Sequence, residues 1–143
     1  MLDKTAIDLS NYRMAKAKDL LSQSRLLYEN QKYDGSINRS YYAIFNAIRS
    51  LLALVRLDSS KHSGVLAFFD RYFVKTAILE KKYSQIAHSA FDTRQDNDYE
   101  DFYIPSEEEA RIQQEDAEKF ISEIESKRQL SINQEINLPV ISR

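Results

Sequence analysis

Cysteine and tryptophan are absent from this sequence, and its 143 residues include only two glycines and two prolines. Without cysteine the chain forms no disulfide, performs no thiol chemistry and holds no cysteine-rich zinc site. The scarcity of glycine and proline favours helices joined by short turns. No apolar run approaches the roughly 18 residues of a membrane-spanning helix, and the N-terminal segment lacks the apolar core of a signal peptide. We therefore expect a cytoplasmic protein.

An excess of charge of one sign is also missing. The chain has 20 Lys and Arg against 22 Asp and Glu, a formal net charge of −2. This balance provides no global basic field for nucleic acid, so any RNA contact requires a local basic patch. With 43% hydrophobic residues, the chain can bury the core of one domain.

The strongest pattern lies between Tyr33 and Arg56. Large apolar residues recur there at every third or fourth position, which is the spacing of one helix face. A second stripe of small residues allows another backbone to approach closely, and Asp34 is placed to cap the first turn. The small stripe consists of Ser40, Ala43, Ala47 and Ser50. A helix that is apolar or small over so much of its surface is expected at the centre of a bundle.

Four further helices are predicted around this central one. One is expected over about 10–29, one carries the apolar residues between 65 and 73, and one runs over about 79–97. The last follows a capping box of Ser106 and Glu109 and ends near residue 127. Ser59 or Ser60 could cap the third helix, and the short turn 30–33 makes the first two helices an antiparallel hairpin. We predict an all-α fold, an up-and-down antiparallel four-helix bundle with an additional short helix. Residues 1–128 form its single domain, and residues 129–143 form a flexible tail or a partner-binding arm.

Motifs of metal-dependent and nucleophilic chemistry are missing. There is no phosphate-binding glycine loop, no zinc-binding helix motif and no Ser-His-Asp set with usable spacing. An acidic cluster before the last helix raises the possibility of calcium, but Asp101 stands where a calcium loop needs its glycine, although Glu107 fits the final ligand position. The cluster consists of Asp92, Asp96, Asp98, Glu100 and Asp101. A solvated acidic loop is the better interpretation, and we predict neither a metal nor another cofactor.

The polar stripe of the central helix carries the candidate binding residues. It consists of Asn38, Arg39, Asn46 and Arg49. These side chains could face Arg94 across the bundle and form a local anion site; the alternative is a solvated stripe. Tyr42 can reach the same side and orient Arg94 through its hydroxyl. His62, in the connector after the central helix, fits an exposed loop histidine or a helix cap better than a catalytic base.

Arg94 itself allows three interpretations. Because Arg94 and Asp98 are four residues apart, they could form an ordinary surface ion pair on one helix. Arg94 could instead bind phosphate or a nucleotide without cleavage, or it could be catalytic.

Three segments taken together resemble HEPN-domain proteins, small helical proteins often encoded beside a minimal nucleotidyltransferase. They are NRSYYAIFNAIRSLL at 38–52, SSKHSGVLAFF at 59–69 and FDTRQDNDYEDF at 91–102. The resemblance covers about residues 10 to 127. It implies an up-and-down helical bundle that usually forms a homodimer, in agreement with the helical pattern.

The resemblance also implies an activity, that of a metal-independent RNase. In such proteins an Arg, followed after four to six residues by a His, lies in a cleft shared by two protomers. The Arg stabilises charge on the scissile phosphate while the His moves the proton of the 2′-hydroxyl. Arg94 occupies the Arg position here, but none of the residues at the His position is a histidine. If the protein cleaves RNA, Asp98 or Tyr99 must handle the proton.

The resemblance also implies that the protein is modified by its nucleotidyltransferase partner. In some pairs of this family, the partner attaches AMP to a tyrosine beside the motif. Tyr99 and Tyr103 lie in the corresponding loop, where a bulky anionic adduct would block the cleft and repel RNA. We therefore expect a homodimeric HEPN protein that acts with a nucleotidyltransferase as a toxin-like RNase. The alternatives are a non-catalytic module that binds nucleotide or RNA phosphate between protomers, and a purely structural dimer.

Overall fold

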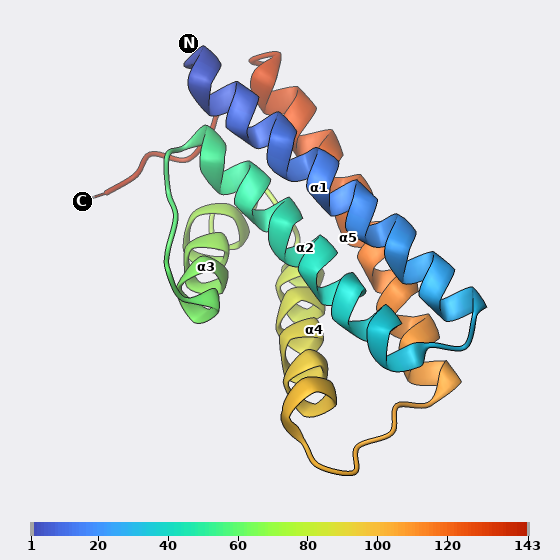
Figure 1. Ribbon diagram of the computed structural model, residues 1–143. Coiled ribbons are helices and arrows are strands. Elements are labelled where there is room, and N and C mark those ends of the chain that lie inside the picture. The colour runs from blue at the N-terminus through green and yellow to red at the C-terminus, as the bar shows by residue number, and fades with distance from the viewer. Residues whose placement is uncertain (1, 143) are drawn as a thin grey trace.

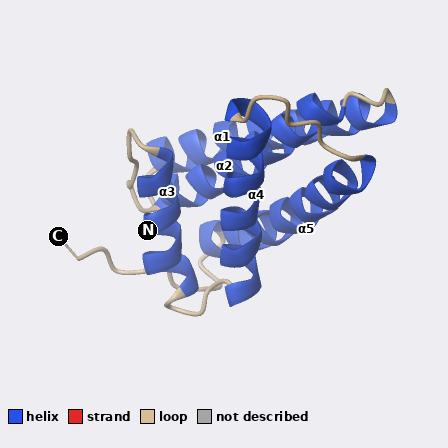
Figure 2. Ribbon diagram, turned by 90° about the horizontal axis from the view of Figure 1, so that it is seen from below, coloured by secondary structure: helices blue, strands red, loops and turns tan. Residues whose placement is uncertain are grey.

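The computed structural model describes residues 2–142, and over this range the chain is a bundle of helices (Figure 1). Its elements are α1 (Lys4–Glu29), α2 (Tyr33–Leu54), α3 (His62–Phe69), a π-helical turn (Asp70–Val74), α4 (Lys81–Tyr99) and α5 (Glu107–Ile132). Between residues 2 and 142, Figure 2 shows helices and loops and no strand. The predicted all-α class is confirmed. None of the described helices is long and apolar enough to cross a membrane.

Helix α2 lies at the centre, as its sequence predicts. It packs against α1, α3, α4 and α5, and its small residues Ala43, Ala47 and Ser50 are fully buried. The chain passes in alternating directions through α1, α2, α4 and α5, which is the up-and-down arrangement (Figure 1). The hairpin of α1 and α2 is tightly joined, because the Ser24 hydroxyl lies 2.6 Å from the Ser40 hydroxyl in a fully buried position.

Helices α1, α2 and α5 end in the same kind of turn, built without glycine. Gln31, Arg56 and Gln134 have φ angles of 62°, 57° and 60°, in the left-handed region that costs a non-glycine residue roughly 1 to 2 kcal/mol. After α1, the Lys32 N–H donates to the Leu27 carbonyl at 2.8 Å, and the other two helices repeat this pattern. The turn is the Schellman motif, for which glycine is the preferred residue.

Two helices begin differently from the sequence expectation. Helix α1 starts at Lys4 rather than Ser10, because the Asp3 carboxylate accepts the Thr5 N–H at 3.0 Å and caps it. Asp34 does not cap α2 but lies in its first turn, where its negative charge interacts favourably with the positive end of the helix dipole. The residue before the helix is Lys32, whose side chain makes no capping hydrogen bond.

Helix α3 also lacks the serine cap that the sequence suggests. Lys61 is the residue before the helix, and it offers no side-chain cap. Ser59 stabilises the approach instead, because its hydroxyl accepts the Lys61 N–H at 3.2 Å. Helix α3 begins at His62, directly after Lys61.

Helix α5 begins where the sequence predicts but ends later than predicted. The Ser106 hydroxyl accepts the Glu109 N–H at 3.1 Å, as predicted for the capping box. The helix continues to Ile132, beyond the predicted end near residue 127. The following segment lies against the π-helical turn, where the Tyr72 hydroxyl donates to the Ser142 carbonyl at 3.2 Å. The flexibility of residues 129–143 stays a prediction.

Candidate functional site

The Arg94 side chain is buried between α2 and α4, with only 8% of the residue exposed. Its Nη2 donates to the Tyr42 hydroxyl at 2.7 Å and lies 3.4 Å from the Tyr99 hydroxyl. Its Nε lies 2.8 Å from Oδ2 of Asp98, close enough for an ion pair, but the N–H does not point at the carboxylate well enough for a hydrogen bond. Within the described chain no hydrogen bond uses Nη1, which leaves this nitrogen for a ligand.

Aromatic rings fix the plane of this guanidinium. The Arg94 carbon Cζ lies 5.4 Å from the ring centre of Tyr41, 5.2 Å from that of Tyr42 and 5.3 Å from that of Tyr99. These are cation–π distances, which stabilise a cation that has lost part of its water. Arg94 is therefore a positioned cation rather than a mobile surface side chain.

Arg94 lines a surface hollow of about 440 Å³, a volume within the range of small-ligand sites. Residues of α2, of α4 and of the start of α3 contribute to its walls. They are Tyr42, Lys61, His62, Ser63, Phe91, Arg94, Gln95 and Tyr99. Two cations and three aromatic rings in one hollow provide partners for a phosphate and for a flat base at the same time.

His62 belongs to this hollow, whereas its place in the connector after the central helix favoured an exposed loop histidine or a helix cap over a catalytic base. Its Nδ1 lies 2.8 Å from the Tyr41 hydroxyl, and its ring packs on Phe45 with a centre-to-centre distance of 4.2 Å. Burial lowers the pKa of His62, and the nearby cations Arg94 and Arg49 lower it further. The ring is therefore neutral at pH 7. The sequence signal was weak, because 32 positions separate His62 from Arg94.

Asp98 is held beside Arg94 as an acceptor. Besides the ion pair, its Oδ2 accepts from Asn38 Nδ2 at 3.1 Å and its Oδ1 accepts from Asn97 Nδ2 at 3.2 Å. The ion pair expected from the sequence is therefore present, but it is not an ordinary surface pair, because Arg94 is buried. Asp98 balances the charge of Arg94 and links it to α2 through Asn38.

The other members of the polar stripe have partners elsewhere. Arg39 donates to Gln23 of α1 at 3.2 Å, and Arg49 forms an ion pair with Asp58 at 2.9 Å. Asn46 donates to the Tyr42 carbonyl of its own helix at 2.8 Å. None of these three lines the Arg94 hollow. The structure thus brings Tyr42 into contact with Arg94 and Asn38 into contact with Asp98. Arg39 also donates to Asn38 Oδ1 at 3.0 Å, but neither Arg39 nor Arg49 lines the hollow.

The two tyrosines that the sequence placed in one loop differ in position and accessibility, because Tyr99 is the last residue of α4 and only Tyr103 lies in the loop. Tyr103 donates its hydroxyl to Glu109, and burial together with this bond raises the pKa of Tyr103 to about 12. Tyr99 is 67% exposed, with its hydroxyl directed toward Arg94. Of the two, only Tyr99 combines a solvent-accessible ring with a place at the hollow.

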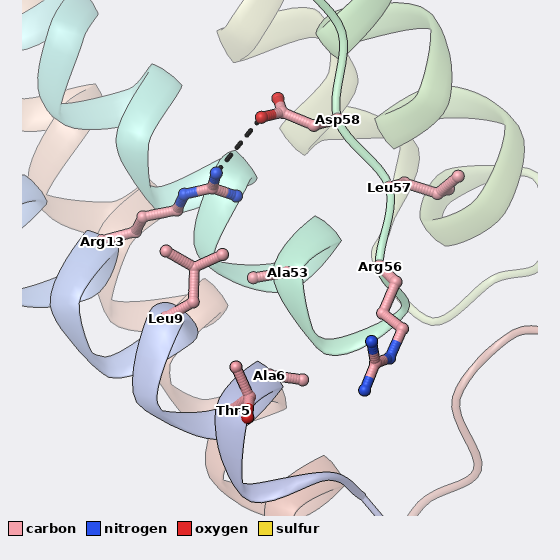
Figure 3. Close-up of a pocket in the computed structure, with 8 residues that line it drawn as sticks. All are labelled: Thr5, Ala6, Leu9, Arg13, Ala53, Arg56, Leu57 and Asp58. Carbon is pink, nitrogen blue, oxygen red and sulfur yellow. Dashed lines mark hydrogen bonds and ion pairs between the residues drawn. The ribbon is translucent and has the colours of Figure 1, made fainter.

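A second hollow of about 240 Å³ lies where the N-terminal half of α1 meets the end of α2 (Figure 3). Its arginines have carboxylate partners: Arg13 Nη2 lies 3.2 Å from Asp58 Oδ2, and Arg56 forms an ion pair with Asp3. Both cations of this hollow are paired, whereas in the Arg94 hollow Lys61 forms no ion pair with the described residues and stays available to an anion. Among the described residues there is no group of three or more His, Cys, Asp or Glu that could hold a metal ion.

The fold and site together define a helical-bundle protein with a buried arginine between helices α2 and α4. Residues 10–127 match the model of the HEPN domain, and the chain belongs to this family. A UPF0332 protein of Thermotoga maritima is 36% identical over 114 residues, covering 80% of this chain and 86% of the relative. A Methanocaldococcus jannaschii protein named "Putative toxin MJ0605" is 36% identical over 108 residues, covering 76% and 80%. A second protein of that organism, "Putative toxin MJ0142", is 35% identical over 95 residues, covering 66% and 65%.

Proposed function

We propose that this protein is a toxin-like HEPN endoribonuclease that cleaves RNA at the Arg94 hollow without a metal ion. The observation that carries the proposal is the state of Arg94, which is buried, held by Tyr42 and Asp98, and left with Nη1 open. A preorganised cation of this kind stabilises the charge that develops on a phosphate during its cleavage. Two relatives carry the word toxin in their names, which supports the same class.

The lining of the hollow favours RNA in single-stranded form as the substrate. Unpaired bases stack on aromatic side chains, and Tyr42, Phe91 and Tyr99 all line this hollow. Lys61 adds a second cation for the phosphate backbone. Because the whole chain carries a net charge of −2, binding depends on this local group of cations rather than on a general basic surface.

We further propose a homodimer in which the hollows of the two protomers form a shared cleft. Large apolar side chains are exposed on the loop after α4: Phe102 is fully exposed and Ile104 is 87% exposed. Burial of such side chains against a second copy would remove them from water. Light scattering at micromolar concentration is the test: a mass of two chains supports the proposal, and a single-chain mass contradicts it.

The proposed partner is a minimal nucleotidyltransferase, and the proposed point of modification is Tyr99. Its exposed ring gives access, and an AMP group on its hydroxyl would bring a phosphate next to Arg94 and fill the hollow. Mass spectrometry after co-expression with such a partner is the test. An AMP adduct on Tyr99 that is lost in Tyr99→Phe supports the proposal, and an unmodified Tyr99 contradicts it.

The main experiment compares growth and RNA integrity in cells that express the wild-type protein, Arg94→Ala or Arg25→Ala. Arg25 is a matched control, because it is an exposed arginine of α1 that pairs with Glu118 far from the hollow. We expect growth arrest and RNA fragments with the wild type and Arg25→Ala, and neither with a folded Arg94→Ala. Intact RNA with the wild type contradicts the RNase proposal. If Arg94 is then still required for binding nucleotide or RNA, the protein is the non-catalytic module.

A further inference from the structure

We infer that His62 is the general base of the Arg94 hollow and supplies the histidine that is missing after Arg94. The inference rests on the proposed RNase function and adds to it a residue from a different helix. It stands on three observations: His62 lines the same hollow as Arg94, one of its ring nitrogens is fixed by a buried tyrosine, and the competing groups are engaged elsewhere.

The position of the His62 ring is fixed from two sides. Tyr41 is 1% exposed, so its hydroxyl, 2.8 Å from Nδ1, is a rigid partner rather than a mobile one. Phe45 supports one face of the ring, with the two ring planes inclined by 30°. With Nδ1 occupied by Tyr41, Nε2 is the nitrogen left for a substrate in the hollow. When Nδ1–H donates to the Tyr41 oxygen, Nε2 carries the free lone pair of a base.

The charges around His62 disfavour its protonated form, in which neither nitrogen has a lone pair. From α2 it faces Tyr41, Tyr42 and Arg49, from α4 it faces Arg94 and Tyr99, and Lys61 precedes it in the chain. The cations in this set disfavour a second positive charge, and burial acts in the same direction by lowering the pKa of His62. The neutral form is the form that a base requires, and it is present at neutral pH.

The proton transfer balances without a cofactor. Nε2 of His62 takes the proton of a ribose 2′-hydroxyl, and the 2′-oxygen forms a bond to phosphorus. The bond from phosphorus to the 5′-oxygen breaks, and that oxygen takes a proton from water. Arg94 Nη1 faces the non-bridging oxygens during this step, and His62 later returns its proton to solvent. The products are a 2′,3′-cyclic phosphate and a 5′-hydroxyl.

The other candidates for this role have different partners. Asp98 accepts from Asn38 and Asn97 and pairs with Arg94, so its oxygens are used within the protein. His88, the second histidine of the chain, lies 2.7 Å from Asp70 through its Nε2 and does not line the hollow. His88 therefore serves as a matched control for His62.

The test uses the full chain and one RNA oligonucleotide, with single-turnover cleavage measured from pH 5 to 9 for the wild type, His62→Asn and His88→Asn. An asparagine at 62 keeps a polar group near the Tyr41 hydroxyl but lacks a base at the Nε2 position. Binding is measured separately with the 2′-deoxy form of the oligonucleotide, which cannot be cleaved. We expect the cleavage rate of His62→Asn to fall by about 100-fold or more, with the binding constant unchanged. In the wild type the rate increases with pH on the acidic side of the profile, because His62 loses its proton there. This increase is lost in His62→Asn and retained in His88→Asn.

Three outcomes decide the matter. If the wild type cleaves and His62→Asn cleaves equally fast with the same pH profile, the inference is wrong while the proposed function stands. If the wild type cleaves no RNA, the proposed function fails first and the base role fails with it. If His62→Asn is shown by circular dichroism to be unfolded, His62→Ala is measured with added imidazole. Restored cleavage then supports the inference, and no restoration in a folded His62→Ala overturns it.

Discussion

The Tyr42 hydroxyl oxygen lies 2.7 Å from Nη2 of Arg94, and this bond joins the central helix α2 to α4 at the hollow. The position of Tyr42 beside the polar stripe predicts this contact. In Tyr42→Phe the aromatic ring stays, but the acceptor of a buried cation is lost. We expect RNA cleavage to fall about 10-fold and the free energy of unfolding to fall by roughly 1 to 3 kcal/mol.

Tyr72→Phe is the control for this prediction. Its hydroxyl also makes one hydrogen bond, to the Ser142 carbonyl, but away from Arg94. Cleavage rates and urea unfolding of the two variants give the comparison. Equal cleavage by both would mean that the bond from Tyr42 does not position Arg94.

Asp98 gives a second prediction, because its carboxylate competes with RNA for Arg94. Asp98→Asn removes that negative charge, so we expect tighter binding of the uncleavable oligonucleotide and a steeper dependence of affinity on salt. Fluorescence anisotropy at two salt concentrations measures both quantities. If binding is instead unchanged and cleavage disappears, Asp98 is the proton carrier and the role assigned to His62 is wrong.

The turn after α1 gives a prediction on stability. Gln31 has a φ of 62°, where glycine avoids the strain of a side chain but costs more conformational entropy on folding. We expect Gln31→Gly to raise the free energy of unfolding by about 0.5 to 1 kcal/mol. Lys16→Gly, at an exposed position inside α1, should lower it by about 1 kcal/mol. Chemical unfolding measures both, and a loss in Gln31→Gly would show that the turn is not strained.

His62 also links stability to pH. Its pKa in the folded protein lies below the ordinary value of 6.5, so the unfolded chain binds the proton more readily. Its contribution to stability is therefore fully present above pH 6.5 and is lost as the pH falls toward the folded-state pKa. We expect the loss of stability between pH 7.5 and 5.5 to be smaller in His62→Asn than in the wild type. An equal or larger loss in the variant would contradict the lowered pKa.

The sequence predicts α2 well because its pattern is local. The apolar and small stripes repeat along one helix, and burial of both follows from helical geometry alone. The polar stripe was harder to interpret. Asn38 and Arg49 lie eleven positions apart, which is about 16 Å along a helix, so its two ends meet different neighbours. Arg49 meets Asp58, whereas Asn38 meets Asp98.

His62 shows where sequence reasoning ends. Its position beside Arg94 depends on how the connector after α2 turns and on how α3 packs against Tyr41 and Phe45. These are contacts between distant segments, and no local pattern in a single sequence reports them. The glycine-free turns after α1, α2 and α5 were missed for a related reason, because residues such as Gln31 carry no signal for a left-handed conformation.

We propose that the Arg94 hollow cleaves RNA without a metal ion. The most direct measurement is the single-turnover cleavage of an RNA oligonucleotide by the purified protein in excess chelator, for the wild type, Arg94→Ala and Arg25→Ala. We predict cleavage by the wild type and by Arg25→Ala, with 2′,3′-cyclic phosphate ends, and a rate at least about 100-fold lower for Arg94→Ala. Equal cleavage by wild type and Arg94→Ala, or none by a folded wild type, would contradict the account.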